Sequence, residues 1–514
     1  MLRLRHFRCL PAIVLLLYTP LFAAPPKLNS LFPAGAQRGQ TVAVAASGSF
    51  DHWPVKAWVD RTGAEITPAD EKGKLSVKIA PEAVPGIYWI RLYDEEGATS
   101  PRPFIVGTIP EILEQEPNDD PRKPQMLESS VVTINGRLEK AGDVDTFALS
   151  LHQGQTLVAA MEANRTLGSP MDASVQIVSA AGFVLQQNDD YHDLDPQVVF
   201  TAPADGTYLV RTFAFPATPD SGIRCSGSAD YVYRLTLTTA GFVDYAYPLA
   251  VTRPTGDLDE SSQSTPPPPT SASGGKPGAA DASFPSVELF GWNVPEAASK
   301  LPVRSAGSDE IVSLFHADLA NLAWVRMEPR STAVEQEPNG RGWPQELRLP
   351  VTITGRIDPV RDEDVFRFQA KKGDKLIFRV ESRALGFPLD PFLRLMDSSG
   401  KTLTDVDDSG GPDAELAFSA PVNGQYHLMI RDLHGQGGER YVYRLSAVFA
   451  EADFSLKLAA DAFTLTPGKP LEIPVTIERT NGFAEEIAIT ATELPEGVMA
   501  SPVKSLGTGD SAKS

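Results

Sequence analysis

The chain of 514 residues contains only two cysteines, Cys9 and Cys225. Cys9 lies in the N-terminal segment that we expect to be removed on export, so the mature chain keeps Cys225 alone. A single cysteine cannot form an intrachain disulfide, and the fold must therefore be stabilised by apolar cores or by metal ions. No histidine stands near Cys225 in the sequence, which favours an unreactive thiol over a nucleophile.

Motifs of catalytic centres are also absent from the sequence. A subtilisin-like peptidase needs Asp, His and Ser in characteristic contexts, and neither Gly-Thr-Ser nor Gly-x-Ser-x-Gly occurs. No His-Glu-x-x-His zinc motif is formed by the histidines of the mature chain, which are His52, His152, His192, His316, His427 and His434. The sequence thus predicts that residues 25–514 are not an enzyme.

Positive charge is scarce: the chain has 46 Lys and Arg residues against 66 Asp and Glu residues, which gives a formal net charge of −20. Such a surface repels the phosphate backbone of nucleic acids and anionic lipids. The composition therefore excludes nucleic acid as the expected partner, and it suits a protein that attracts divalent cations.

Long apolar runs are missing except at the N-terminus. Three arginines (Arg3, Arg5 and Arg8) precede an apolar run over residues 10–22, which is followed by Ala23 and Ala24. This order is typical of a secretory signal peptide. We expect residues 1–24 to be a leader, the mature chain to have no membrane span, and the protein to be secreted, periplasmic or on the cell surface.

Turn-forming residues, in contrast, are abundant, with 44 Pro and 40 Gly. Short runs with alternating apolar residues lie between them, such as Phe147, Leu149 and Leu151. A period of two at short spacing indicates antiparallel strands packed as a sandwich. The length favours three to five domains, and the predicted fold class is all-β, as tandem β-sandwiches.

A repeat is the strongest internal signal. Glu114–Asn118, Glu-Gln-Glu-Pro-Asn, recurs at Glu335–Asn339, and Tyr231–Leu235, Tyr-Val-Tyr-Arg-Leu, recurs at Tyr441–Leu445. Five further matches lie between them in the same order, at 134–137 and 353–356, 143–147 and 362–366, 167–172 and 385–390, 189–190 and 407–408, and 202–208 and 420–426. Chance does not produce such an order, and the sequence therefore contains two copies of one domain.

The remaining segments divide the chain further. The region between the copies contains a Pro/Ser/Gly-rich stretch, 253–286, whose composition is typical of disordered linkers. The final segment is shorter than an immunoglobulin-like domain usually is, so we expect an incomplete domain and a sequence that is a fragment. The predicted domains are 25–108 (immunoglobulin-like), 109–240 (copy 1), 241–334 (β-containing connector), 335–450 (copy 2) and 451–514 (incomplete immunoglobulin-like).

The repeated residues resemble the bacterial pre-peptidase C-terminal (PPC) domain. The shared features are Glu-Pro-Asn near the start, a Gly followed by Asp-x-Asp-x-Phe, Ala-Pro followed by Gly-x-Tyr, and a closing Tyr-x-Tyr-x-Leu. The resemblance implies a jelly-roll-like sandwich appended to secreted peptidases and other surface proteins, without catalysis of its own. Residues 25–108 more loosely resemble IPT/TIG immunoglobulin-like modules, and the whole arrangement resembles exported proteins of planctomycete-type bacteria.

Calcium is the ligand that this resemblance implies. In collagen-binding domains of clostridial collagenases, which are similar to this family, acidic segments at the domain start and at Asp-x-Asp bind calcium. The matching residues of copy 1 are Glu114, Glu116, Asn118, Asp119, Asp143 and Asp145. Those of copy 2 are Glu335, Glu337, Asn339, Asp362 and Asp364. Because Gly340 stands where copy 1 has Asp119, the second site lacks one expected ligand.

Two alternatives to calcium remain open at the level of the sequence. The carboxylates can be solvated, with Asn118 and Asp145 capping turns. Further acidic loops, with Asn188, Asp189, Asp190 and Asp195 in copy 1 and Asp407, Asp408 and Asp413 in copy 2, are interpreted either as plain turns or as a second calcium site.

Two functions are compatible with these features. The first is a non-catalytic exported scaffold that binds a protein or a polysaccharide at or outside the cell surface. The alternative is the accessory region of a secreted peptidase whose catalytic domain lies outside this sequence, beyond Ser514. The sequence marks no ligand-binding face that would decide between them.

Overall fold

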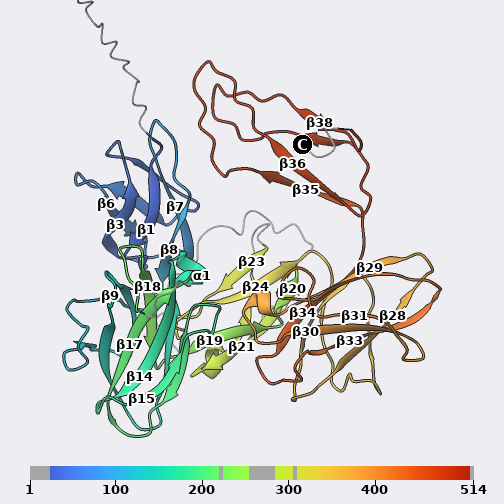
Figure 1. Cartoon of the computed structure of the whole chain (residues 1–514), viewed down its shortest axis with the longest axis horizontal. Coiled ribbons are helices and arrows are strands. Elements are labelled where there is room, and N and C mark those ends of the chain that lie inside the picture. Colours follow the sequence, from blue (N-terminus) through green and yellow to red (C-terminus); the bar gives the residue numbers. More distant parts are fainter. Residues whose placement is uncertain (1–23, 219–223, 254–283, 305–309, 510–514) are drawn as a thin grey trace, which may run out of the picture.

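The computed structural model describes residues 24–218, 224–253, 284–304 and 310–509, and these residues form almost only β-structure. The predicted all-β class of tandem sandwiches is confirmed (Figure 1). The expected leader, apart from Ala24, and most of the Pro/Ser/Gly-rich stretch lie outside the described residues. No helix in the described ranges is long and apolar enough to cross a membrane.

The N-terminal domain is a sandwich of two four-stranded sheets, β1-β3-β6-β5 and β2-β8-β7-β4. Its period-two pattern is clearest in β7, where Tyr88, Ile90 and Leu92 are fully buried and Trp89 and Tyr93 point outward. The strands are β1 (Lys27–Phe32), β2 (Gly35–Gln37), β3 (Thr41–Ser49), β4 (Lys56–Val59), β5 (Ala64–Pro68), β6 (Lys74–Ile79), β7 (Gly86–Tyr93) and β8 (Arg102–Gly107).

Copy 1 is a sandwich of two five-stranded sheets, β10-β12-β17-β14-β15 and β16-β13-β18-β11-β9. Apolar side chains from both sheets, including Phe147 and Tyr233, form one continuous core. Its elements are β9 (Glu111–Leu113), β10 (Gln125–Met126), β11 (Val131–Arg137), β12 (Asp145–Leu151), β13 (Thr156–Glu162), α1 (Asn164–Leu167), β14 (Met171–Ser179), β15 (Val184–Asn188), β16 (Gln197–Thr201), β17 (Gly206–Pro216) and β18 (Val232–Thr238).

Copy 2 has the same topology strand for strand, with sheets β26-β28-β33-β30-β31 and β25-β27-β34-β29-β32. Phe366 and Tyr443 take the core positions that Phe147 and Tyr233 occupy in copy 1. Its elements are β25 (Thr332–Val334), β26 (Gln345–Glu346), β27 (Val351–Arg356), β28 (Asp364–Ala370), β29 (Lys375–Glu381), η3 (Arg383–Leu385), β30 (Pro391–Asp397), β31 (Thr402–Val406), β32 (Glu415–Ser419), β33 (Gly424–Asp432) and β34 (Val442–Phe449).

The middle region, 241–334, contains β-structure, as expected from its sequence. Its described residues form two three-stranded sheets, β19-β21-β22 and β20-β24-β23, around an apolar core that includes Val287 and Val325. The elements are β19 (Phe242–Tyr247), β20 (Ala250–Thr252), β21 (Ser286–Trp292), η2 (Glu296–Ala298), β22 (Lys300–Pro302), β23 (Ile311–Leu314) and β24 (Ala323–Glu328).

The middle region repeats features of the N-terminal domain. In the N-terminal domain β2 pairs in parallel with β8, and in the middle region β20 pairs in parallel with β24. In both regions an aromatic residue that precedes a proline stacks against an arginine of the following copy. Phe32 lies under Arg137, and Tyr247 lies under Arg356. The described residues before the C-terminal segment therefore form two successive pairs, each a smaller β-sheet body followed by a ten-stranded sandwich.

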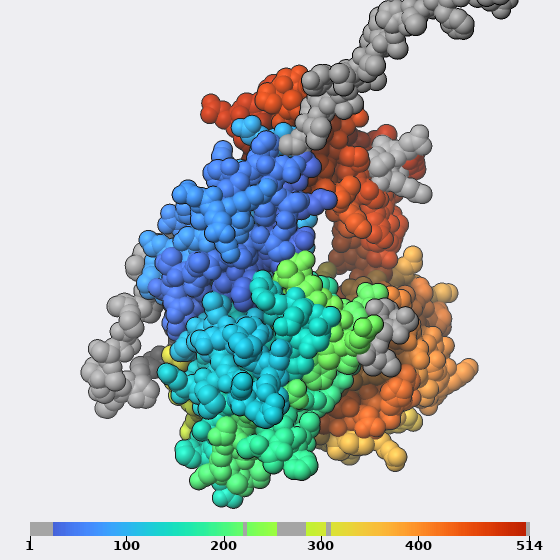
Figure 2. All heavy atoms as spheres, turned by 60° about the vertical axis from the view of Figure 1, so that its left-hand side comes forward, coloured from blue at the N-terminus to red at the C-terminus, as the bar shows by residue number. Residues whose placement is uncertain are grey.

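Within each pair the two bodies are in contact. Figure 2 shows the N-terminal domain (blue) seated on copy 1 (cyan to green), with copy 2 (orange) beside copy 1. Ala34 and Ile105 of the N-terminal domain pack on Leu167 and Val232 of copy 1. In the second pair, the hydroxyl of Tyr245 donates to the carbonyl of Glu439 at 2.7 Å.

The C-terminal segment carries two two-stranded sheets, β35-β36 and β37-β38. Its strands are β35 (Asp453–Leu458), β36 (Val475–Thr480), β37 (Ile487–Ile489) and β38 (Val503–Ser505). It reaches the N-terminal domain through an ion pair between Arg91 and Asp461, at 2.9 Å.

Candidate metal sites in the two repeats

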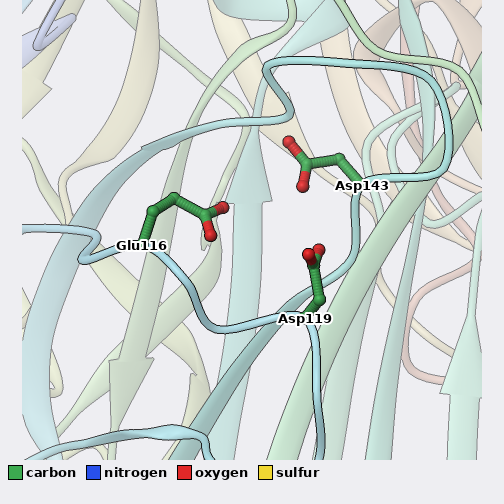
Figure 3. Close-up of side chains that lie close together, drawn as sticks. All are labelled: Glu116, Asp119 and Asp143. Carbon is green, nitrogen blue, oxygen red and sulfur yellow. The ribbon is translucent and has the colours of Figure 1, made fainter.

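In copy 1, the segment between β9 and β10 and the turn before β12 bring three carboxylates together. One oxygen each from Glu116, Asp119 and Asp143 lies within 4.8 Å of the other two. Figure 3 shows the three side chains converging, Glu116 and Asp119 from one segment and Asp143 from a neighbouring turn. The backbone N–H of Val144 donates to Asp119 at 3.2 Å, which holds the two segments in register.

Buried oxygens without a hydrogen-bond partner surround this cluster. Asp143 accepts from the N–H of Glu139 through Oδ2, at 2.5 Å, while its Oδ1 has no partner. Oδ1 of Asp145 and both polar atoms of the Asn118 side chain also have none, although all three residues are buried. Orphaned buried polar atoms each cost free energy, and their concentration beside clustered carboxylates makes this end of copy 1 a candidate metal site.

Glu114 and Asp145 lie deeper and share a tyrosine. The hydroxyl of Tyr233 lies 2.6 Å from Oδ2 of Asp145, to which it donates, and 3.2 Å from Oε2 of Glu114. Oε1 of Glu114 accepts from the N–H of Arg137 at 2.7 Å. A Cβ on Gly136 would lie against the Tyr233 ring and 2.6 Å from Glu114 Oε2, so the repeated glycine leaves room for this network.

The electrostatics of copy 1 disfavour a full set of charged carboxylates without a cation. Burial, reinforced by Asp145, raises the pKa of Glu114 to about 10. Burial also raises the pKa of Asp145 to about 7, and burial together with Asp119 raises that of Asp143 to about 6. A divalent cation among these groups would favour their charged forms.

Copy 2 repeats the deep part of the site. Oxygens of Glu335, Glu337 and Asp364 lie within 4.8 Å of one another, and Asp364 accepts from the hydroxyl of Tyr443 at 2.6 Å. Oδ1 of Asp364, Oε2 of Glu335 and the side chain of Asn339 are buried without partners. Burial raises the pKa of Glu335 to about 7 and that of Asp364 well above its ordinary value.

Asp362 differs from its counterpart Asp143. Its two oxygens accept from the backbone N–H groups of Asp358, at 3.1 Å, and Glu363, at 2.9 Å. Gly340 offers no side chain where copy 1 has Asp119. The carboxylates that converge are therefore Glu116, Asp119 and Asp143 in copy 1. In copy 2 they are Glu335, Glu337 and Asp364, while Asp362 accepts hydrogen bonds within its own turn.

The geometry of both clusters fits calcium. Calcium–oxygen distances of 2.3–2.6 Å let ligand oxygens on opposite sides of the ion lie about 5 Å apart, which matches the spacing of the carboxylates. The donors are all hard oxygens from Asp, Glu and Asn, with no thiolate or imidazole among them, as calcium prefers. In copy 1, Glu116, Asp119 and Asp143 would hold the ion, with Asn118 and Asp145 as the nearest additional donors.

In the other acidic loops, one aspartate of each copy bonds to the first N–H groups of a short helix. Asp195 accepts from the N–H groups of Asn164 and Arg165, at 2.7 and 3.1 Å, at the start of α1. Asp413 does the same for η3 through Arg383 and Ala384, both at 2.9 Å. These contacts support the plain-turn interpretation of the loops rather than a second calcium site in each copy.

Sequence reasoning missed two residues of each site, the tyrosine and the glycine. Tyr233 and Tyr443 come from the closing Tyr-x-Tyr-x-Leu motif, and Gly136 and Gly355 from the repeated Ile-x-Gly-Arg. Both motifs occur in both copies, and this recurrence was the signal in the sequence that could have identified the tyrosine and the glycine as site residues. Their contact with the acidic residues joins positions about a hundred residues apart, which no local pattern reveals.

Comparison with known proteins identifies the two copies. The family described as "Bacterial pre-peptidase C-terminal domain" matches residues 143–214 and 362–432. The expected presence of two PPC domains is thereby confirmed. The IPT/TIG-like character of residues 25–108 and the planctomycete-type source stay predictions.

One curated relative and several solved structures are similar to parts of the chain. A probable subtilase-type serine protease of Deinococcus radiodurans is 39% identical over 104 residues, which cover 20% of this chain and 14% of that protein. The PPC domain of a Bacillus anthracis collagenase is 18% identical over 23% of this chain and 97% of that chain, with a TM-score of 0.17. The Bacteroides ovatus protein SGBP-B, solved with a mixed-linkage heptasaccharide, is 9% identical over 80% of this chain and 75% of that chain, with a TM-score of 0.15.

Proposed function

We propose that the protein is a non-catalytic binding or scaffold protein outside the cytoplasm, in which a calcium ion closes one end of each PPC domain. In copy 1, calcium would fix the segment before β10 to the turn before β12. In copy 2 it would fix the corresponding segments, before β26 and before β28, to each other. The two pairs of bodies then form a stiff support for binding faces elsewhere on the molecule. The localisation follows from the N-terminal sequence and from the secreted proteins in which PPC domains occur.

The observation that carries this proposal is that both copies place clustered carboxylates beside buried polar atoms without partners. Each copy has three converging carboxylates, a buried asparagine whose side chain has no hydrogen-bond partner, and a buried Asp that accepts from a tyrosine hydroxyl. If the carboxylates were only solvated, their oxygens would face water rather than lie buried without partners. If they only capped turns, the buried oxygens would accept hydrogen bonds from backbone N–H groups.

Thermal unfolding of the full chain tests the role of calcium. In millimolar calcium the melting temperature should exceed that in chelator by a few degrees, because a ligand of the folded state at a hundred times its Kd stabilises by about 2.7 kcal/mol. Magnesium should do less, since it demands a tighter octahedral shell.

A matched pair of variants makes this test specific. Asp143→Ala should remove most of the calcium effect on copy 1. Asp205→Ala, at an exposed turn of the same copy, should retain it. Equal melting in calcium and chelator, at matched ionic strength, would leave the acidic residues as turn caps and solvated carboxylates.

The second candidate function is the accessory region of a secreted peptidase. It is favoured by the 39% identity to part of a probable subtilase-type serine protease. The purified chain should not hydrolyse casein under either function, and cleavage of casein by the chain itself would contradict both. A longer reading frame with a Ser/His/Asp signature would favour the peptidase alternative.

A further inference from the structure

The loop between β15 and β16 of copy 1 differs from its counterpart in copy 2. Residues 189–195 are Asp-Asp-Tyr-His-Asp-Leu-Asp, whereas residues 407–413 are Asp-Asp-Ser-Gly-Gly-Pro-Asp. The first two aspartates and the last recur, but Tyr191 and His192 occur in copy 1 alone. In copy 2 a Cβ at Gly410 or Gly411 would meet nothing within 4 Å, so that loop faces open space. The tyrosine and the histidine therefore serve a contact that only copy 1 makes.

His192 makes this contact with copy 2. A Cβ at Gly386, the left-handed residue that ends η3, would lie 3.2 Å from Nδ1 of His192 and 3.1 Å from Nη1 of Arg165. Nδ1 of His192 is buried and has no hydrogen-bond partner. Because Gly386 has no side chain, the imidazole and the guanidinium of copy 1 approach the backbone of copy 2 directly.

Tyr191, next to the histidine, contacts both other bodies of this junction. The guanidinium of Arg440, from copy 2, lies 4.1 Å from the centroid of the Tyr191 ring. Arg440 in turn donates to Asp244 of the middle region at 2.6 Å. Trp292, also of the middle region, packs edge-on against Tyr191 with 6.4 Å between the ring centroids. The loop thus lies where copy 1, the middle region and copy 2 meet.

The charges around His192 are mainly positive. Arg165 approaches it from copy 1 and Arg440 from copy 2. The two buried carboxylates of the junction are already engaged, because Asp244 pairs with Arg440 and Asp195 accepts from the first N–H groups of α1. The other acids of the loop are exposed to solvent: Asp189, Asp190 and Asp193. A protonated imidazole at this position would be a third cation, so the closed contact requires a neutral ring.

The electrostatics give this requirement a sign and a pH range. Burial lowers the pKa of His192 to about 4, and Arg165 and Arg440 act in the same direction, against a smaller opposing effect of the Gly386 backbone. Once copy 2 moves away, the pKa should return toward about 6.5. Between these values the closed form holds fewer protons than the open form. The contact is therefore fully favoured above about pH 6.5 and weakens as the pH falls toward 4.

We propose that His192 is a pH-dependent latch between the two repeats: the neutral ring holds copy 1 on copy 2, and the protonated ring releases it. This inference goes beyond the proposed binding role. It does not depend on calcium, because none of the latch residues belongs to the candidate metal sites. Copy 1 stays on the middle region through an apolar contact of Val158 with Phe242 and Ala320. Release should therefore open a hinge between the copies rather than separate them.

Pulsed electron paramagnetic resonance of the full chain measures this opening. Nitroxide labels would be placed at the equivalent exposed positions Ser150 of copy 1 and Gln369 of copy 2, each replaced by Cys in a Cys225→Ser background. The distance distribution should be narrow at pH 7.5. At pH 5 a second population at longer distance should appear, because the ratio of open to closed chains rises up to about tenfold for each pH unit below 6.5.

Three variants make the result specific to the latch. His192→Gln cannot be protonated, so its distribution should stay narrow at pH 5. Arg165→Met keeps the imidazole and removes one opposing charge, so the change with pH should become smaller. The matched control is His152→Gln in the same copy, because the side chain of His152 is 82% exposed. This control should respond to pH as the wild type does.

Histidine-selective NMR of the full chain keeps the test decisive if a variant does not fold. The His192 signal, assigned by its absence in His192→Gln or by elimination, should titrate with a midpoint below about 6. Three results would overturn the proposal: a narrow distribution in the wild type at pH 5, an opening that persists in folded His192→Gln, or a midpoint for His192 at or above about 6.5. Repeating the distance measurements with calcium and with chelator separates the two proposals, since opening that follows calcium rather than pH would reject the latch.

Discussion

At the scale of single residues, the two glycines beside the candidate metal sites leave space for a tyrosine side chain. Gly136 and Gly355 face Tyr233 and Tyr443, each with a glutamate oxygen 2.6 Å from where a Cβ would stand. The tyrosine can reach the buried Asp only because that Cβ is absent. The glycine, the tyrosine and the acids therefore belong to one arrangement, which explains why all of them recur in the repeat.

Gly136→Ala should therefore destabilise copy 1 by about 1–3 kcal/mol or more, because overpacking of a core displaces side chains and backbone. The matched control is Gly206→Ala, where a Cβ would meet nothing within 4 Å and the backbone is extended. Urea unfolding of both variants measures the difference. Similar losses of unfolding free energy would show that the Tyr233 network does not need the glycine.

Without calcium, the raised pKa values give the stability of copy 1 a pH dependence. Burial raises the pKa of Asp143 to about 6 and that of Asp145 to about 7, against about 3.9 for an unperturbed aspartate. Between these values the folded state holds more protons than the unfolded state, so its stability falls as the pH rises. Calcium should offset this loss, because it replaces the protons.

The calcium-induced rise in melting temperature should therefore be small at pH 5 and larger at pH 8. Calorimetric scans of the full chain at pH 5, 6, 7 and 8, with calcium and with chelator, measure it. In the Asp143→Ala variant, the contribution of copy 1 to the calcium-induced rise in melting temperature should depend less on pH. A calcium effect that grows as the pH falls would contradict the account.

At the scale of secondary-structure elements, the arginine of Tyr-x-Tyr-Arg-Leu pairs with two glutamates in each copy. Arg234 on β18 pairs with Glu162 on β13 and with Glu111, on the strand that follows the N-terminal domain, at 2.5 and 2.6 Å. Arg444 on β34 pairs with Glu381 on β29 and with Glu328 at the end of β24. Arg444 thus joins copy 2 to the middle region, whereas Arg234 ties the first strand of copy 1 to the rest of its sheet.

Arg444→Met should lower the free energy of unfolding by about 3–5 kcal/mol, because it leaves Glu328 buried without its cation. Arg379→Met, which removes an exposed ion pair with Glu415 on the same sheet, should cost less than about 1 kcal/mol. Denaturant unfolding of the two variants compares them. Equal effects would mean that the buried pair does not hold the junction.

The sequence predicted the elements that repeat and missed those that depend on distant contacts. Identical residues in one order located both sandwiches and the acidic segments, because each motif sits at a strand end or a turn. The different roles of Asp143 and Asp362 could not be predicted, since they depend on how each turn directs its backbone N–H groups. The core of the middle region was also missed, because a linker-like stretch interrupts its strands in the sequence.

At the scale of the whole molecule, the chain consists of two pairs of bodies rather than isolated modules on linkers. The middle region contacts both copies: Asn293 donates to the carbonyl of Thr156 at 2.9 Å, and Asp244 pairs with Arg440 at 2.6 Å. The two candidate metal sites are consequently held at fixed positions relative to one another, which suits a scaffold.

Residues 24–240 should melt at a higher temperature than residues 109–240, in a single transition. The N-terminal domain covers Leu167 and Val232, and full burial of such side chains stabilises by about 1.5–3 kcal/mol each. Calorimetry of the two fragments provides the comparison. Two separate transitions in 24–240, one of them identical to that of 109–240, would show that the pair is not a thermodynamic unit.

The central claim is that each PPC domain holds one calcium ion, and equilibrium dialysis of the full chain against labelled calcium tests it most directly. The account predicts about two ions bound per chain at millimolar calcium, with weaker binding in copy 2, where Gly340 replaces an acid and Asp362 is engaged by its own turn. Asp119→Ala combined with Asp143→Ala should remove the tighter ion and leave the other. Binding of no calcium by the wild type, or equal binding by the double variant, would contradict the account.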